Sequence, residues 1–264
     1  MRARGPAGPP ARPEKAIAMN KLETKNISMA FDGRTIIEDI SIHVKKGELV
    51  SLLGLSGSGK TTLFNCIAGL YQPATGQVLL DGRNITGQTG HLAYMLQKDL
   101  LLQHYTIEDN VALPLVIRGQ KRREARAAVQ EYFPEFGLEG TQKMYPSQLS
   151  GGMRQRAALL RTYMFSHDVA LLDEPFSALD TITKSQIHEW YLDIMEEINL
   201  TTVFITHDID EAILLSDRIY IMAGRPGRID GEVRIEPARR ERDGFNLTPE
   251  FLAYKRQIVE MIGM

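Results

Sequence analysis

Cysteine is nearly absent from this chain, as are long apolar runs and any strong excess of charge. Cys66 is the single cysteine among 264 residues, so no disulfide can form within the chain and no oxidising compartment is required. No apolar run approaches the roughly 18 residues that a membrane span needs. The net charge of −2 argues against a protein that binds nucleic acid mainly by electrostatic attraction. We therefore expect a cytosolic protein without a nucleic-acid partner, and any membrane crossing must come from other chains.

The start of the chain differs in composition from the rest. Residues 1–18 are rich in proline, glycine and arginine and contain no apolar block long enough for a secretory signal. We expect this segment to be disordered, with Met19 as a second candidate for the start of translation. The whole chain is 43% hydrophobic and 24% charged, which is ordinary for a globular protein with a substantial core.

Residues 54–61 fit the phosphate-binding pattern G-x-x-x-x-G-K-[ST] at every constrained position. The residues before them predict a buried strand and the residues after them predict a helix, which is the context that this motif requires. Glycines let backbone N–H groups turn toward a phosphate at the positive end of the helix. Lys60 adds a positive charge, and the Thr61 hydroxyl is placed to bind Mg²⁺. The residues expected to contact the nucleotide here are Gly54, Leu55, Ser56, Gly57, Ser58, Gly59, Lys60, Thr61 and Thr62.

The segments around this loop predict an α/β fold. Apolar runs at residues 169–174, 202–208 and 218–222 alternate with helical segments, which indicates a parallel sheet covered on both faces. Before the loop, residues 22–27 and 40–44 flank a turn at residues 32–34 and predict antiparallel strands. The sequence therefore predicts a nucleotide-binding parallel sheet with an antiparallel β layer beside it.

The periodicity becomes helical between about residues 100 and 165. Thr106 can cap a helix with Glu108 and Asp109 in its first turn, and residues 121–136 carry apolar side chains at helical spacing. We expect a helical subdomain inserted into a main domain of residues 19–237. Residues 238–264 form a C-terminal extension, in which Thr248 and Pro249 begin a helix with an apolar stripe of Phe251, Leu252, Ile258, Val259 and Ile262.

Polar side chains occur where the predicted parallel strands end. Adjacent residues on a strand point in opposite directions, so we assign Asp173 to Mg²⁺ and Glu174 to general-base activation of the attacking water. Either acid alone could instead cap a helix before Pro175. His207 ends a second strand at the same edge and is a candidate to hold the γ-phosphate or orient the water. Gln97 follows another predicted strand, and its amide could reach Mg²⁺ or water or have no role in the site.

A second candidate anion site is the helix N-terminus that begins at Ser150, Gly151 and Gly152. One nucleotide cannot easily contact both this helix end and the P-loop of the same compact chain. We therefore expect a head-to-tail homodimer, in which this helix end closes the site of the second chain.

Together these residues resemble the ATP-binding subunits of ABC transporters, from about Leu22 to Met222. The resemblance rests on the P-loop and on Leu149-Ser150-Gly151-Gly152, which is similar to that family's signature motif. It implies the ABC ATPase fold, a RecA-like P-loop core with an antiparallel β subdomain and an inserted helical subdomain. It also implies ATP and Mg²⁺ as cofactors, with Gln97 as the Q-loop glutamine and His207 as the switch histidine. Asp180 would belong to the D-loop, and Phe31 would stack on adenine in place of the commoner tyrosine.

Several stretches are similar to the nitrate, sulfonate and taurine branch of bacterial importers. They are Met153, Asp109-Asn110-Val111, Phe176-Ser177-Ala178-Leu179-Asp180 and Arg225-Pro226-Gly227-Arg228-Ile229. The resemblance implies two membrane permease subunits and an extracytoplasmic solute-binding protein as partners, with the ATPase at the cytoplasmic face of the membrane. The solute stays open, because members associated with a pyrimidine precursor of thiamine look alike. A soluble ABC-type ATPase without transport and an exporter ATPase are the alternatives. Leu100, Leu101, Leu102 and Tyr105 are candidates for docking on the permease or for core packing.

Overall fold

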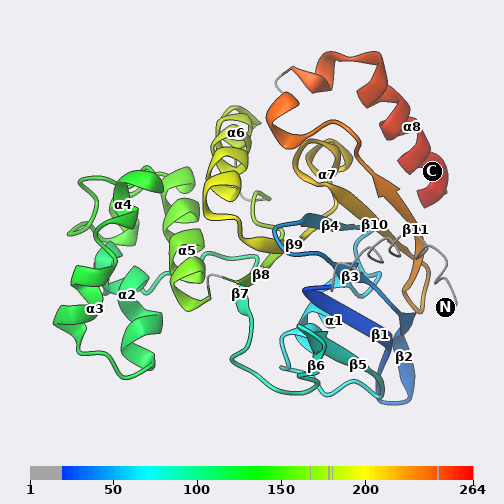
Figure 1. The fold of residues 1–264 in the computed structure, drawn as a ribbon, viewed down its shortest axis with the longest axis horizontal. Helices are drawn as coiled ribbons and strands as arrows, with labels where there is room; N and C mark the ends of the chain where they lie inside the picture. The colour runs from blue at the N-terminus through cyan, green and yellow to red at the C-terminus, as the bar shows by residue number, and fades with distance from the viewer. Residues whose placement is uncertain (1–19, 167, 178, 180, 243, 264) are drawn as a thin grey trace, which may run out of the picture.

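The loop that contains residues 54–59 follows β4 (Leu49–Leu53), a central strand of a six-stranded sheet (Figure 1). The computed structural model describes residues 20–263 except 167, 178, 180 and 243, so the predicted disorder of residues 1–18 lies outside the described residues. In spatial order the strands are β11 (Arg228–Arg234), β10 (Arg218–Ala223), β4 (Leu49–Leu53), β9 (Thr201–Thr206), β8 (Val169–Asp173) and β7 (Ala93–Met95). Every neighbouring pair is parallel except β10 and β11, which confirms the predicted parallel sheet and adds an antiparallel edge strand.

The apolar composition of the central strands explains their position. Every residue of β4, β8 and β9 is buried, as expected for strands covered on both faces. The carboxyl ends of these parallel strands lie at one edge of the sheet, where the residues that follow β4, β8 and β9 come together.

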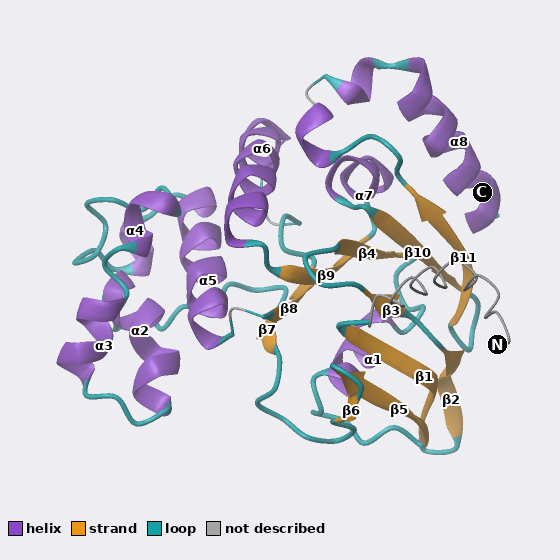
Figure 2. Cartoon of the chain, viewed as in Figure 1, coloured by secondary structure: helices purple, strands orange, loops and turns teal. Residues whose placement is uncertain are grey.

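A second sheet, with antiparallel strands, lies beside the first. Its strands are β1 (Leu22–Phe31), β2 (Arg34–Ile40), β3 (His43–Val44), β5 (Thr75–Leu80) and β6 (Arg83–Asn84). The predicted turn is confirmed: Asp32 and Gly33 have positive φ values of 48° and 76°, which suit a tight hairpin between β1 and β2. Helix α1 (Lys60–Ile67) packs between the two sheets, where its Leu63 and Phe64 join one apolar cluster with residues of both (Figure 2).

Four helices gather at one end of the molecule (Figure 1). They are α2 (Ile107–Ile117), α3 (Arg122–Ala128), α4 (Tyr132–Glu135) and α5 (Gly151–Phe165). Thr106 caps α2 as predicted, and its Oγ1 accepts a hydrogen bond from the Asp109 N–H at 3.4 Å. The helical spacing over residues 121–136 is divided between two helices, α3 and α4. Pro134 has no N–H to donate and its ring excludes the residue 130 carbonyl, so the chain breaks between α3 and α4.

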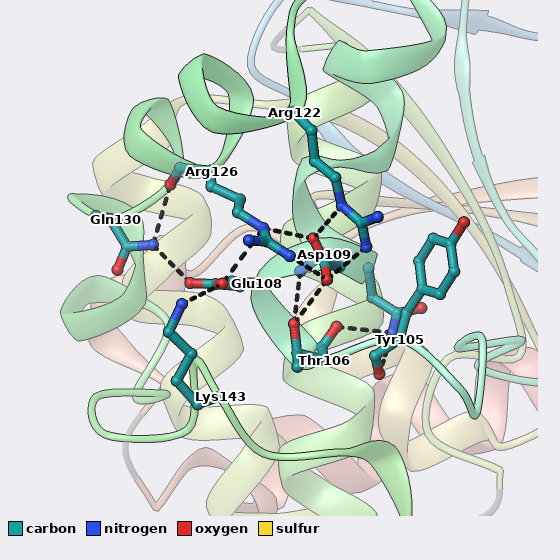
Figure 3. Close-up of polar contacts among 9 residues, drawn as sticks. Tyr105, Thr106, Glu108, Asp109, Arg122, Arg126, Gln130 and Lys143 are labelled. Carbon is teal, nitrogen blue, oxygen red and sulfur yellow. Dashed lines mark hydrogen bonds and ion pairs between the residues drawn. The ribbon is translucent and has the colours of Figure 1, made fainter.

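Two buried carboxylates in the first turn of α2 bind several helical segments together (Figure 3). Asp109 accepts hydrogen bonds from Arg122 Nε at 2.9 Å and from Arg126 Nε at 2.6 Å, both on α3. Glu108 pairs with Lys143, which comes from the segment before α5. Burial by itself raises the pKa of Asp109, but the hydrogen bonds from Arg126 and Arg122 outweigh burial and hold that pKa below its usual range. The cluster fixes α2 against α3 in the charged state of Asp109.

The remaining helices cover the central sheet and the C-terminal part. They are α6 (Thr181–Ile198), α7 (Ile209–Leu215) and α8 (Pro249–Ile262), with short 3₁₀ turns at Pro146–Gln148, Arg239–Glu241 and Phe245–Leu247. Helix α8 begins after Thr248 as predicted, and its Phe251 and Ile258 are buried against β10 and α7. Leu252 is 51% exposed, so its expected place in the buried stripe is wrong. Among the described helices none combines the length and apolarity of a bilayer span.

Candidate nucleotide site

A pocket of about 460 Å³ lies over the P-loop. Its lining residues are Ser56, Gly57, Gly59, Lys60, Thr61 and Thr62 of the loop and α1, together with Ile36, Gln97, Glu174, Ile205 and His207. The volume is within the usual range for small-molecule sites. The polar groups come from the P-loop, the start of α1 and the residues after strands, and the apolar groups come from β2 and β9. The pocket therefore suits a ligand with one strongly charged part.

The P-loop adopts a conformation that requires glycine. Gly57 and Gly59 have φ values of 83° and 94°, in the left-handed region that side chains disfavour. A Cβ at Gly59 would lie 2.4 Å from Ile37 Cγ2, so β2 approaches the loop too closely for any side chain there. Three expected contact residues of the loop, Gly54, Leu55 and Ser58, are not among the residues that line the pocket in the described part of the chain.

Lys60 is buried at the base of the pocket. Its Nζ donates hydrogen bonds to the carbonyls of Gly54 at 2.8 Å and Leu55 at 3.0 Å. Burial lowers the pKa of Lys60, and the nearby carboxylates of Glu174 and Asp173 oppose this shift. An anion in the pocket would favour the charged ammonium in the same way, because an opposite charge offsets the cost of burial.

Two oxygen donors meet beside the loop. Thr61 Oγ1 donates a hydrogen bond to Asp173 Oδ2 at 3.1 Å, which joins the start of α1 to the end of β8. Burial raises the pKa of Asp173, although the Thr61 hydrogen bond opposes this shift. A hydroxyl and a carboxylate are hard oxygen ligands of the kind that Mg²⁺ prefers, so this pair fits the expected metal position.

Glu174 lies between two other predicted residues. Its Oε2 accepts a hydrogen bond from Gln97 Nε2 at 2.9 Å, and its Oε1 is 3.2 Å from His207 Nδ1. The argument from strand alternation does not apply to it, because β8 ends at Asp173 and Glu174 has a left-handed φ of 47°. The two carboxylates nevertheless have different partners, Thr61 for one and Gln97 with His207 for the other.

Other predicted residues lie apart from this pocket. Ser150 caps α5, with its Oγ accepting from the Met153 N–H at 3.2 Å, but Ser150, Gly151 and Gly152 are absent from the pocket lining within the described residues. Phe31 ends β1, is 41% exposed and packs edge-to-face on Tyr71 at 5.4 Å between ring centroids. Asp180 lies outside the described residues.

The sequence alone did not indicate the apolar side of the site. Ile36 and Ile205 line the pocket from β2 and β9, and Tyr71 supports the ring of Phe31. The positions of Ile36 and Tyr71 depend on how the second sheet packs on α1, for which local periodicity carries no signal.

Comparison with known proteins gives consistent relatives. A family model described as ABC transporter matches residues 37–177. The chain is 42% identical over 222 residues to the formylaminopyrimidine import ATP-binding protein ThiZ of Halalkalibacterium halodurans, covering 84% of this chain and 87% of that protein. It is 38% identical over 233 residues to the aliphatic sulfonates import ATP-binding protein SsuB 2 of Burkholderia cenocepacia, covering 88% and 85%.

A solved structure extends this likeness to three dimensions. The ATP-binding cassette MJ0796, in a dimeric post-hydrolysis state bound to ADP and Pi, is 28% identical with a TM-score of 0.69, and the match covers 82% of this chain and 100% of that one. The resemblance found in the sequence and the predicted ABC ATPase fold are both confirmed. Since the family model spans more than half of the sequence and close relatives span most of it, the chain belongs to the ABC transporter family.

Proposed function

We propose that this chain is the ATP-binding subunit of an importer for a small organic solute, of the sulfonate or formylaminopyrimidine kind. Relatives named for the import of such compounds match most of its length. The observation that carries the proposal is the contact of Glu174 with Gln97 and His207 at the edge of the P-loop pocket. A carboxylate held there is placed to take a proton from a water that attacks a terminal phosphate.

In this proposal different residues bind the nucleotide and activate the attacking water. Lys60 and the backbone N–H groups of the P-loop bind the phosphates, and Phe31 stacks on the adenine ring. Glu174 is the general base, while Gln97 and His207 hold its two carboxylate oxygens and so orient it.

Mg²⁺ completes the site in this proposal. Thr61 and Asp173 would hold it, with Gln97 as a further oxygen donor, and the metal would offset negative charge on the phosphates. The raised pKa of Asp173 fits this role, because a bound cation would stabilise the charged carboxylate that burial disfavours.

The complete site requires a second copy of the chain. Ser150, Gly151 and Gly152 form the capped N-terminus of α5, which suits an anion but lies apart from the chain's own pocket. We propose that two chains pair head-to-tail, so that this helix end and Asp180 of one chain complete the pocket of the other. The dimeric state of the related cassette MJ0796 supports the pairing of two chains.

An apolar groove is the proposed docking site for a permease segment. It has a volume of about 340 Å³ and runs between the α1 end of the core and the proposed helical subdomain, about residues 100–165. Its lining includes Leu70, Leu92, Leu113, Ile117 and Phe165, and Ile117 is 75% exposed. The lining of the groove does not include the four candidate docking residues: Leu101 is buried in the core, Tyr105 is half-buried, and Leu100 and Leu102 are exposed. Docked through the groove, the chain would sit at the cytoplasmic face of the membrane, with a solute-binding protein on the other side.

Co-isolation from membranes tests this function. The chain, isolated from the membranes of its own cells, should be recovered with permease subunits, and Ile117→Asp should lose them. Leu247→Asp is the matched control, since Leu247 is 86% exposed and does not line the groove. Equal recovery of both variants would refute the docking site, and a wild-type chain found only as a soluble dimer would refute the importer function.

A further inference from the structure

The turn between β10 and β11 is attached to the second sheet close to the P-loop. The Gly227 N–H donates to the Ile36 carbonyl at 2.8 Å, and the Glu38 N–H donates to the Gly227 carbonyl at 3.0 Å. These two hydrogen bonds form a short parallel bridge between the turn and β2. The turn therefore has a fixed position relative to Ile36, which itself lines the nucleotide pocket.

This turn and the end of β10 touch the P-loop through their backbones. A Cβ at Gly227 would lie 1.9 Å from the Ser58 carbonyl oxygen, and a Cβ at Gly54 would lie 2.2 Å from the Met222 carbonyl oxygen. No side chain fits at either position, so each segment needs a glycine where it meets the other. The turn is thus part of the wall that supports the P-loop.

Arg225 lies in this turn and reaches the P-loop with its guanidinium. Its Nη2 is 3.2 Å, and its Cζ 3.9 Å, from the place that a Cβ of Gly57 would occupy. Gly57 lines the nucleotide pocket, so the guanidinium of Arg225 lies beside a residue of the pocket wall. The side chain is exposed and therefore accessible to a ligand at the rim.

The charge of Arg225 is not used by the fold. Within the described part of the chain it has no ion pair and no hydrogen bond. Its neighbour Arg228 pairs with Glu38 at 2.6 Å, and Arg218 pairs with Glu48 at 2.6 Å. Lys60 directs its ammonium at two loop carbonyls. Arg225 thus supplies an unpaired positive charge beside the P-loop.

We propose that Arg225 is a further nucleotide-binding residue, whose guanidinium binds phosphate oxygens at the rim of the P-loop beside Gly57. A planar guanidinium presents a fork of N–H donors that matches phosphate oxygens, and it stays charged at all relevant pH values. This inference rests on the proposed function, because it assumes that the pocket binds a nucleoside triphosphate. It gives the Arg225–Pro226–Gly227 turn two tasks, since Gly227 supports the loop and Arg225 contacts the ligand.

Equilibrium binding of Mg·ATP and Mg·ADP to the full chain, by calorimetry, tests the proposal. Arg225→Gln should weaken Mg·ATP binding by about three- to tenfold at low salt, the scale expected for one charge several ångströms from a polyanion. The loss should be smaller for Mg·ADP, and it should shrink at high salt because the guanidinium is exposed. Arg225→Lys should recover part of the affinity. Arg228→Gln is the matched control, since it removes the same charge three residues along and should leave the affinity unchanged.

The outcomes separate this inference from the function on which it rests. Wild-type binding with equal affinity in Arg225→Gln would overturn the role of Arg225 and leave the nucleotide site standing. Unchanged affinity combined with impaired ATP-dependent dimerisation would also overturn it, because the guanidinium would then contact the second chain. Failure of the wild-type chain to bind Mg·ATP would overturn both.

Discussion

Replacing Glu174 with glutamine should separate ATP binding from ATP hydrolysis. The substitution keeps the size of the side chain and removes its ability to accept a proton. In the structure Glu174 Oε2 accepts from Gln97 Nε2 at 2.9 Å, and Oε1 lies 3.2 Å from His207 Nδ1. A glutamine side chain has one oxygen that accepts hydrogen bonds, where the carboxylate has two. It can therefore keep both contacts only if the Gln97 amide turns or His207 changes its tautomer. The cost in the free energy of unfolding should be about 1 kcal/mol, the net value of one hydrogen bond.

The effect on the rate should be larger than the effect on stability. Loss of a general base slows turnover by about 10²-fold or more. This corresponds to at least about 2.7 kcal/mol in activation free energy. ATP binding should persist, because Lys60 and the P-loop keep their positions and the site loses a negative charge close to the phosphates.

Phosphate release under single-turnover conditions, together with the ligand-induced shift in melting temperature, tests this expectation. The Glu174→Gln chain should retain a shift with Mg·ATP, since a ligand that binds the native state stabilises it, while phosphate release falls. Glu139→Gln, at an exposed position, is the control for the change in charge. Phosphate release by Glu174→Gln at the wild-type rate would refute the assignment of the general base.

Two further substitutions test the supports of the site. Asp109→Asn should lower the free energy of unfolding by about 1.5–3 kcal/mol in urea titrations at pH 7, because hydrogen bonds from Arg126 and Arg122 to a charged group are lost. In the wild type the same contribution should begin to fall as the pH drops below the ordinary pKa of 3.8, and it should be lost as the pH passes through the lower pKa of the folded state. Gly227→Ala should weaken Mg·ATP binding measured by calorimetry, because its Cβ would lie 1.9 Å from the Ser58 carbonyl oxygen and displace the P-loop.

For each substitution, one result would contradict the structural reason given for it. A difference between wild type and Asp109→Asn that stayed constant from pH 7 to pH 3 would contradict the charged state of this cluster. Gly231→Ala is the control for Gly227→Ala, because its Cβ would meet only the flexible end of Met261. Equal Mg·ATP affinity in these two glycine variants would contradict the packing of the β10–β11 turn against the P-loop.

The elements that converge on the pocket were predictable because parallel strands end at one edge of their sheet. The P-loop follows β4, Glu174 follows β8 and His207 follows β9, and each strand is apolar enough to be recognised from the sequence. Helix caps were equally local, as Thr106 and Ser150 show. A motif that spans a strand, a loop and a helix can be recognised from local sequence, because the neighbouring residues predict the strand and the helix.

The features that the sequence did not predict depend on contacts between distant segments or on single backbone angles. The left-handed φ of Glu174 turns its side chain to the pocket against simple strand alternation. The division of residues 121–136 into α3 and α4, with Pro134 in the second, is not visible in their apolar spacing. The approach of Arg225 to Gly57 joins residues that are far apart in the chain, and only the packing of β10 beside β4 brings them together.

Calorimetric titration of Mg·ATP into the wild-type chain and Lys60→Ala tests the central claim most directly. Lys60 is the buried cation at the base of the P-loop pocket, and its removal should weaken binding at least about tenfold, or 1.4 kcal/mol. The wild-type chain should bind one nucleotide per chain. Equal affinity for the two proteins would contradict the P-loop pocket as the nucleotide site.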